Sequence, residues 1–246
     1  MFATKAVEEQ VVTNSAKTPA LVWSKERRMP RRQAPGVEQI VRTAIGLADS
    51  EGPDAVSMRR IATELESGTA SLYRYIASRD DLLDLMIDAV RGEVAPPALV
   101  GDWRTDLTAV AQHLRDTMIR HPWLASELTG RPTLGANSLR LHDTSLAAAT
   151  ELTPDITSAA AIVDTVHAYV FGATAAQLAE EQAQRRTGLT EDQWRETVAP
   201  YIREVIASED YPHFARRVRD AADADADQRF DFGLGCILDG IAARID

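Results

Sequence analysis

Apolar residues recur at helical spacing from Val37 onward. They fall three, four and seven positions apart, which places them on one face of an α-helix. Gly52–Pro53 ends this predicted helix, because glycine accepts a left-handed conformation and proline cannot continue the backbone hydrogen bonds. The apolar face consists of Val37, Ile40, Val41, Ala44, Ile45 and Ala48.

Short helices are predicted directly after this break. Ser57 is a suitable N-cap for the first of them, and the Glu-Ser-Gly sequence at 66–68 predicts a turn. Thr69 is expected to cap the next helix, which covers residues 70–76, and Ser78 to cap another with acidic residues in its first turn. The apolar stripe behind Ser57 is formed by Met58, Ile61, Ala62 and Leu65.

The remainder of the chain also shows helical spacing. One stripe covers residues 107–118 and ends at His121–Pro122, and another is formed by Phe230, Leu234, Ile237, Leu238 and Ile241. Thr153–Pro154 predicts an N-cap followed by proline at the first position of a long helix that continues to about Arg186.

Two further signals mark helix ends in the C-terminal part. Thr187–Gly188 ends the long helix, and Thr190 with Gln193 predicts a capping box for the helix that follows. Sustained period-two alternation and hairpin turn signals are both lacking, so the predicted fold is all-α.

Length and composition indicate a globular protein of one or two domains. The chain has 246 residues, of which 45% are hydrophobic and 26% charged. Its single cysteine, Cys236, excludes an intrachain disulfide and favours a reduced, cytoplasmic protein; we expect it to be a small core residue. The first thirty residues lack the pattern of a secretory signal. The weakly charged stretch 158–179 is expected to be a buried amphipathic helix rather than a membrane span.

Charge is distributed unevenly along the chain. The whole chain carries a formal charge of -10, but residues 25–80 contain ten Lys or Arg against eight Asp or Glu. Only this part of the chain is therefore suited to bind a polyanion such as a nucleic acid. Residues 1–36, with the basic cluster Lys25–Arg32, are expected to be a flexible arm that is either a solvated linker or a contact to DNA.

The segment from Ser57 to Ile76 predicts a helix–turn–helix. Such a unit sets its second helix at a steep angle to the first, so that the second can enter the major groove of DNA. Residues near the start of that helix read base edges, while hydroxyl and basic groups around it bind phosphates. Any helical bundle contains short helix–turn–helix pieces, so spacing alone leaves a purely structural role open. The expected DNA-binding residues are Ser57, Arg59, Thr69, Ala70, Ser71, Tyr73, Arg74, Tyr75 and Arg79.

Particular motifs in this segment resemble the TetR family of transcriptional regulators. They are Asp49-Ser-Glu-Gly52, Ser57-Met-Arg-Arg-Ile-Ala62, Ser71-Leu-Tyr-Arg-Tyr75 and Ser78-Arg79 followed by Leu82-Leu83. The rest of the chain is similar, more weakly and by layout, to family members with a tetracycline-repressor-like C-terminal domain. The motifs that carry this likeness are His121-Pro-Trp123, Gly130-Arg-Pro132 and Phe230-x-Phe-Gly-Leu234.

The resemblance implies a homodimeric regulator, most simply a repressor. Residues 37–80 would form the DNA-binding domain, and residues 81–246 a helical domain for ligand binding and dimerisation. An effector in that domain would release a palindromic operator by changing the spacing of the two heads. The expected dimer residues are Val163, Val166, Val170, Ala173, Ile237, Leu238 and Ile241, each of which could instead belong to the core of one chain.

The effector pocket is expected to be apolar with a few polar groups. Tetracycline repressors use a histidine just ahead of a segment like Gly130-Arg-Pro132, and the matching position here is Glu127, which argues against tetracycline and leaves a larger apolar or aromatic effector open. The candidate lining residues are Met86, Val110, Leu114, Met118, Trp123, Glu127, Leu128, His142, His167 and Phe171.

Other chemistry has little support in the sequence. The histidines form no zinc-binding pattern, and no cofactor motif is present. Asp223-x-Asp225-x-Asp227 has the first ligands of a calcium loop but lacks the glycine and the glutamate that should follow, so it is expected to be a solvated acidic loop. The alternatives to a regulator are a small helical enzyme or sequestering protein for an apolar or aromatic molecule, and a structural interaction module.

Overall fold

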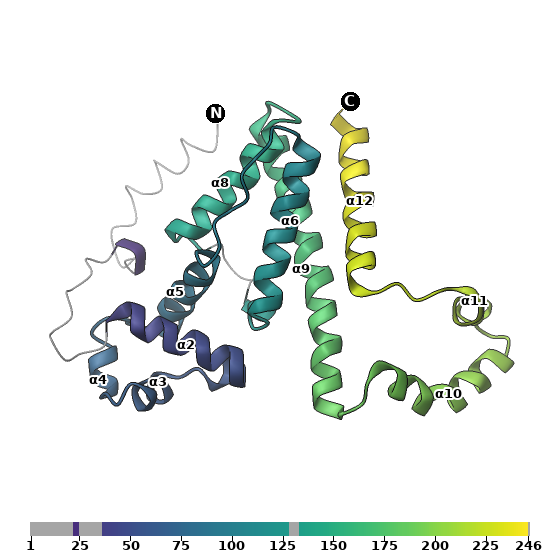
Figure 1. Cartoon of the computed structure of the whole chain (residues 1–246), viewed down its shortest axis with the longest axis horizontal. Coiled ribbons are helices and arrows are strands. Elements are labelled where there is room, and N and C mark those ends of the chain that lie inside the picture. Colours follow the sequence, from purple (N-terminus) through teal and green to yellow (C-terminus); the bar gives the residue numbers. More distant parts are fainter. Residues whose placement is uncertain (1–21, 25–35, 128–132, 246) are drawn as a thin grey trace, which may run out of the picture. The chain divides into compact units, whose positions relative to one another are not determined.

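The computed structural model describes residues 22–24, 36–127 and 133–245, and every regular element within them is a helix (Figure 1). The predicted arm 1–36 therefore lies almost wholly outside the described residues, as do Leu128 and the segment Gly130–Pro132. The chain divides into two compact units, a head of residues 1–93 with 133–139 and a body of residues 94–132 with 140–246.

The core of the head is built from the predicted apolar stripes. Ile40 and Ala44 of α2, Ile61 of α3 and Leu72 of α4 are fully buried, together with Ile76 in the turn that follows α4. Because these residues come from successive short helices, each helix is held by the others rather than by its own length. The elements are η1 (Val22–Ser24), α2 (Val37–Glu51), η2 (Pro53–Ala55), α3 (Met58–Glu64), α4 (Thr69–Leu72) and α5 (Arg79–Arg91).

The boundary of the DNA-binding domain after residue 80 stays a prediction. The compact head itself continues through α5 to Glu93. The reason is that α5 is amphipathic and packs against α2, burying Leu82, Leu85 and Met86.

The first turn of α8 (Ala136–Thr150) also belongs to the head. Asp88 Oδ1 on α5 accepts a hydrogen bond of 2.8 Å from the backbone N–H of Ser138, and Asn137 Nδ2 donates to the Asp88 carbonyl at 3.0 Å. Gly135 fits beside Asp88 because a Cβ at that position would lie 2.1 Å from the Asp88 Cγ. Asp88 thus supplies an N-terminal acceptor to a helix that is distant in sequence.

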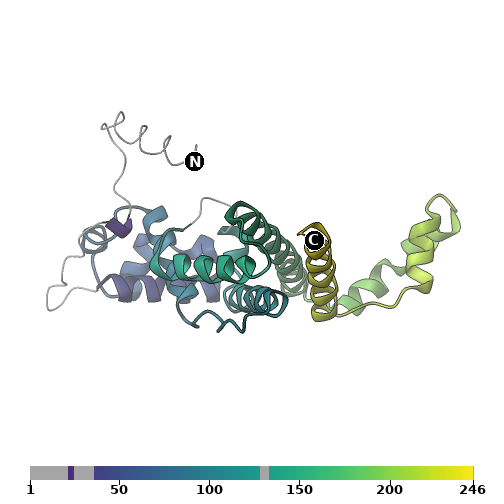
Figure 2. The same ribbon diagram turned by 90° about the horizontal axis from the view of Figure 1, so that it is seen from above.

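The body is built on one long central helix. α9 contacts both α6 and α12, and Figures 1 and 2 show α12 running beside it. Its buried residues recur every three or four positions, from Ala159 to Leu178. The body elements are α6 (Trp103–Arg120), α7 (Leu124–Glu127), most of α8, α9 (Ile156–Thr187), α10 (Glu191–Ala207), α11 (Pro212–Asp220) and α12 (Ala226–Ile245).

Among the described helices, α9 alone is long and apolar enough, by length and composition, to cross a membrane. In the structure it packs against α6, α7 and α12 of the body through one apolar side. The expectation of a buried amphipathic helix is met on that side only, since 28% of the most apolar stretch is buried within the chain.

The two ends of α9 differ in how well the sequence predicts them. Its C-terminus is confirmed, because Gly188 adopts the left-handed conformation with φ of 69°. Its N-terminus is corrected, because the cap is Asp155, which accepts from the Ser158 N–H at 2.9 Å, rather than Thr153. Asp155 is equally suited to capping and lies closer to the first helical residue, Ile156.

The predicted solvated acidic loop is confirmed in that Asp223, Asp225 and Asp227 are exposed, although Asp227 lies in the first turn of α12 and each aspartate has a structural partner. Asp223 accepts from Arg217 at 2.7 Å and pairs with Arg195 at 2.8 Å, and these hydrogen bonds and charges lower its pKa. Asp225 caps α12 by accepting from the Gln228 N–H at 2.8 Å. Asp227 pairs with the buried Arg115.

Cys236 is exposed, contrary to the prediction of a core residue. It lies on α12, whose buried side is formed by Phe230, Leu234, Leu238 and Ile241. A residue two positions from both Leu234 and Leu238 lies on the opposite side of the helix. The apolar composition of the segment does not reveal which side Cys236 takes.

Candidate nucleic-acid interface

The turn between α3 and α4 is fixed by local backbone chemistry. Ser57 caps α3 as predicted, its hydroxyl accepting from the Arg60 N–H at 3.2 Å. The chain then reverses through Glu66, which has a positive φ of 47°, and the Ser67 N–H donates to the Ala62 carbonyl at 2.8 Å. The turn therefore directs α4 away from the axis of α3, as a helix–turn–helix requires.

The second helix is shorter than predicted and begins differently. α4 covers only Thr69–Leu72, and its N-cap is Gly68 rather than Thr69. Gly68 has extended backbone geometry and no side chain to contribute, while its carbonyl already accepts from the Ser71 N–H. The turn continues past Leu72, because the Ile76 N–H donates to the Leu72 carbonyl at 3.0 Å.

Every residue predicted to contact DNA has an accessible side chain. On the segment 69–76, Leu72 and Ile76 are buried against the head, whereas the residues between them are exposed or half-buried. Tyr73 is 54% exposed, a high value for a large aromatic side chain in a structured segment. The apolar side thus anchors this segment, and the polar and aromatic side is presented outward.

The exposed arginines of the head differ in their partners. Arg59, Arg74 and Arg79 are exposed, and none of them pairs with a carboxylate among the described residues. Arg74 Nη2 instead donates to the Ser71 hydroxyl at 2.7 Å, which holds both side chains on the exposed face of α4.

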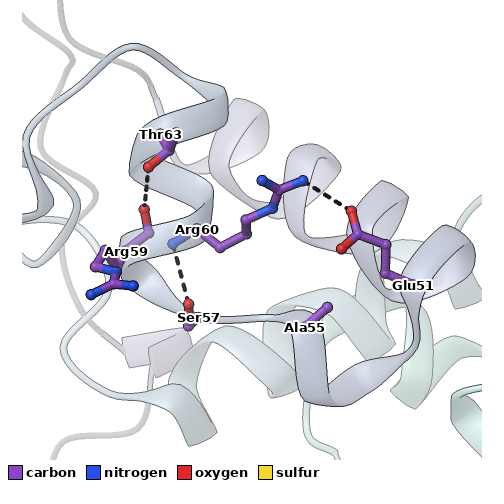
Figure 3. Close-up of a pocket in the computed structure, with 6 residues that line it drawn as sticks. All are labelled: Glu51, Ala55, Ser57, Arg59, Arg60 and Thr63. Atoms are coloured by element: carbon purple, nitrogen blue, oxygen red, sulfur yellow. Dashed lines mark hydrogen bonds and ion pairs between the residues drawn. The ribbon is translucent and has the colours of Figure 1, made fainter.

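Arg60 has the opposite environment. It pairs with Glu51 and with Glu64, each at 3.0 Å. Figure 3 shows the pair with Glu51 beside an open hollow of the head. The charge of Arg60 is therefore neutralised within the head, while the neighbouring Arg59 keeps its own. The hollow is lined by Glu51, Ala55, Ser57, Arg59, Arg60 and Thr63.

The predicted effector residues are divided between the two compact units. Val110, Leu114, Met118 and Trp123 are buried in the body, and Met86 is buried in the head. His142 is exposed on α8.

Half-buried residues of the body add polar and aromatic groups. Glu127, His167 and Phe171 are half-buried. His167 Nε2 lies 3.4 Å from the Ser145 hydroxyl of α8, and its ring is 6.0 Å from that of Phe171. The body therefore combines apolar side chains with a few polar groups, which suits a small organic ligand.

The predicted dimer residues are mostly buried within one chain. Val163, Val166 and Val170 on α9 are at most 1% exposed, and Leu238 on α12 is 2% exposed. Periodicity identified the apolar side of each helix correctly. That side packs against helices of the same chain, so it offers little surface to a second subunit.

Sequence reasoning missed the buried carboxylates Asp88 and Asp106 and the buried Arg115. Arg115 lies on α6 and is 4% exposed. A signal for it existed, since Arg115 is four positions after Ala111 and three before Met118 in the buried stripe of α6.

An exposed recognition segment on a helix–turn–helix head, joined to a helical body, defines a DNA-binding transcriptional regulator with a separate regulatory domain. Residues 40–86 match the family described as "Bacterial regulatory proteins, tetR family", and residues 95–245 match "Tetracyclin repressor-like, C-terminal domain". The chain belongs to the TetR family of transcriptional regulators, which confirms the resemblance seen in its motifs.

Relatives and solved structures agree with this assignment. The HTH-type transcriptional repressor DrrR1 of Streptomyces coeruleorubidus is 38% identical over 94% of this chain and 86% of its own length. An HTH-type transcriptional regulator of Saccharopolyspora erythraea is 32% identical over 94% of this chain and 95% of its own. The crystal structure of apo ActR from Streptomyces coelicolor has a TM-score of 0.72 and 29% identity, covering 89% of this chain and 98% of ActR.

Proposed function

We propose that this chain represses transcription by binding an operator through its head and releases it when a small molecule binds the body. The observation that carries the proposal is the outward presentation of Ser71, Tyr73 and Arg74 by a segment anchored through Leu72 and Ile76. Hydroxyl, phenol and guanidinium groups at this place can bind base edges and phosphates.

The effector is proposed to be apolar or aromatic. ActR, to which the chain is similar, has been solved in complex with actinorhodin and with (S)-DNPA, so a related body accommodates small molecules. The buried residues Val110, Leu114, Met118 and Trp123 provide apolar surface in this body. Glu127 takes the place of the histidine of tetracycline repressors, so a different effector from tetracycline is expected.

Release follows from a shift in population. A ligand changes the equilibrium between DNA-competent and incompetent forms only by the difference in its affinity for them. Moving the competent fraction from about 99% to about 1% requires roughly a 10⁴-fold difference in that affinity. We therefore expect the effector to bind free repressor much more tightly than DNA-bound repressor, because binding is reciprocal.

A homodimer is proposed to form through the exposed sides of α9 and α12. The α9 side carries small residues at helical spacing, and the α12 side carries Phe232, which is 76% exposed, with small residues after it. A Cβ added at Gly172 or Gly240 would meet no atom of its own chain within 4 Å, so neither glycine is needed for packing inside one chain. These exposed small residues are Ala161, Thr165, Ala168, Gly172, Ala176 and Ala179 on α9, and Cys236, Gly240 and Ala243 on α12.

Other features fit a regulator that acts on DNA in the cytoplasm. The curated relatives are named as transcriptional repressors or regulators rather than as enzymes. The acidic body restricts contact with DNA to the head, where Arg59, Arg74 and Arg79 have no carboxylate partner in the part of the chain that the structure describes.

Selection from a pool of duplexes with a randomised central region tests the proposal without knowledge of the operator. The full chain should enrich a two-fold symmetric sequence whose half-sites are about 34–36 Å apart, one turn of DNA or a multiple of it. A parallel selection with the Tyr73→Ala/Arg74→Ala chain is the control. If the wild-type chain enriches nothing beyond that control, the chain does not read DNA through α4.

A further inference from the structure

Arg74 faces directly away from the core of the head. Leu72 and Ile76 are both buried, and the exposed Arg74 lies two positions from each of them. At about 100° per residue, this spacing sets Arg74 on the side of the segment opposite to the core. The helical course continues over these residues, because the Ile76 N–H donates to the Leu72 carbonyl at 3.0 Å. A helix in the major groove turns this side to the base edges, whereas phosphates flank the groove.

The Ser71 hydroxyl holds the guanidinium of Arg74. Arg74 Nη2 donates to Ser71 Oγ at 2.7 Å, across about one turn of helix. This hydrogen bond draws the guanidinium back over α4, toward the helix start from which base edges are read. It uses a single N–H of the guanidinium, so the other donors remain for a ligand. A side chain that is already held in one position also loses less freedom when it binds DNA.

The chemistry of a guanidinium discriminates between the bases. It presents parallel N–H groups in a planar fork and has no acceptor. In the major groove guanine offers two neighbouring acceptors, N7 and O6, whereas adenine offers one acceptor beside an amino donor. Cytosine offers an amino donor, and thymine offers one acceptor beside a methyl group. Guanine is therefore the base that matches Arg74.

The other exposed arginines of the head have different positions. Arg59 lies in the first turn of α3 and Arg79 in the first turn of α5, so both are outside the segment 69–76. Basic groups that flank a reading helix generally contact phosphates, which fixes the protein on the duplex without selecting a sequence. Recognition of a base by an arginine is thus left to Arg74.

We propose that Arg74 reads a guanine in the operator and that Ser71 is the positioning residue that orients it. The guanidinium donates to N7 and O6 of that guanine, while Nη2 keeps its hydrogen bond to the Ser71 hydroxyl. The inference rests on the proposed function, because it names the base that the head recognises. Arg74 then determines the sequence of the operator as well as the affinity for it.

Modified duplexes test this inference with the full chain, after selection has given the operator sequence. Selections with the wild type and with Arg74→Ala should differ at a guanine that only the wild type requires. There, 7-deazaguanine replaces N7 by a C–H group and still pairs with cytosine, whereas inosine keeps N7 and O6 and changes only the minor groove. With the substitution in both half-sites, the wild type should bind the 7-deazaguanine duplex about tenfold more weakly and the inosine duplex nearly unchanged.

Variants assign this preference for guanine to the two residues. Arg74→Ala should bind the guanine and 7-deazaguanine duplexes equally. Ser71→Ala should lose most of the preference, whereas Ser71→Thr, which retains a hydroxyl, should keep it. Arg79→Ala is the matched control, because loss of a phosphate contact weakens both duplexes by the same factor and leaves the preference unchanged. Thermal unfolding followed by circular dichroism verifies that the variants are folded.

The outcomes separate this inference from the proposed function. If the wild type tolerates 7-deazaguanine at every guanine of the operator, or if Arg74→Ala weakens both duplexes by the same factor, Arg74 does not read guanine. If Ser71→Ala keeps the full preference, Ser71 does not position Arg74. Each of these results leaves an operator that the wild type selects, so the proposed function stands. Failure of the wild type to select any sequence would refute both.

Discussion

At the scale of single residues, ion pairing decides which basic groups of the head can meet DNA. Arg59 and Arg60 are adjacent in the sequence, yet Arg60 pairs with Glu51 and Glu64 while Arg59 has no carboxylate partner among the described residues. A paired arginine must lose its partners before it binds a phosphate, so Arg59 is the better suited of the two.

His113 leads to a prediction about pH. Its pKa is lowered from the ordinary value of 6.5, chiefly by burial and further by the charge of Arg120, while Asp116 opposes the shift. The unfolded chain therefore takes up this proton more readily than the folded chain. The contribution to stability is complete above about pH 6.5 and is lost as the pH falls through the lowered pKa.

His113→Gln should remove this share of the pH dependence. The measurement is the urea midpoint of unfolding at pH 7.5 and at pH 5.5, compared with His213→Gln, a change on the exposed surface of α11. The drop in midpoint between the two pH values should be smaller for His113→Gln than for the wild type or the control. Equal drops in all three proteins would show that His113 does not contribute.

Residue-level prediction from sequence succeeded where a local motif determines the structure. The caps at Ser57 and Ser78 and the Thr190–Gln193 capping box are confirmed, because each depends on only a few neighbouring residues. Prediction failed where two nearby residues are equally suited to be the N-cap of a helix, as with Thr153 and Asp155 at the start of α9. It also missed Asp227 as the partner of Arg115, since an ion pair between helices distant in sequence leaves no local signal.

At the scale of helices, tertiary packing defines the recognition element. α4 has only four residues, which is too short to be stable alone. Leu72 and Ile76 hold it to the head, so its orientation depends on the core formed with α2 and α3. The sequence predicted this element but overestimated its length, because the turn that follows α4 keeps partly helical spacing.

The exposed side of α9 gives a prediction about assembly. Gly172→Leu should leave the subunit folded, because leucine forms helix better than glycine and the added Cβ meets nothing within 4 Å of its own chain. It should weaken the proposed dimer, because the larger side chain prevents close approach of two helices. Sedimentation velocity should show more monomer for Gly172→Leu than for the wild type at the same concentration.

Gly46→Leu is the matched control for this experiment. Gly46 is also exposed within a helix, α2, and an added Cβ there also meets nothing within 4 Å. If both variants remain as dimeric as the wild type, α9 does not form the subunit contact. The sequence could not decide this, since the same apolar period serves packing within one chain and between two chains.

At the scale of the whole molecule, charge and fold together limit where DNA can bind. The chain is acidic overall, with a formal charge of -10, and the basic excess lies in residues 25–80. The fold class and the family follow from periodicity, caps and the head motifs, and the family matches confirm them. The effector residues were predicted less well, because apolar residues that line a pocket and those that fill a core share one pattern.

The most direct test of the account is operator affinity as a function of salt for Arg74→Ala. On the selected duplex, this variant should bind about tenfold or more weakly than the wild type, with a shallower salt dependence if the guanidinium contacts a phosphate. Arg42→Ala is the control, because Arg42 is exposed on α2 and pairs with Glu38 at 2.6 Å. It should retain nearly wild-type affinity. Equal affinity of the wild type and Arg74→Ala would contradict the claim that α4 reads DNA.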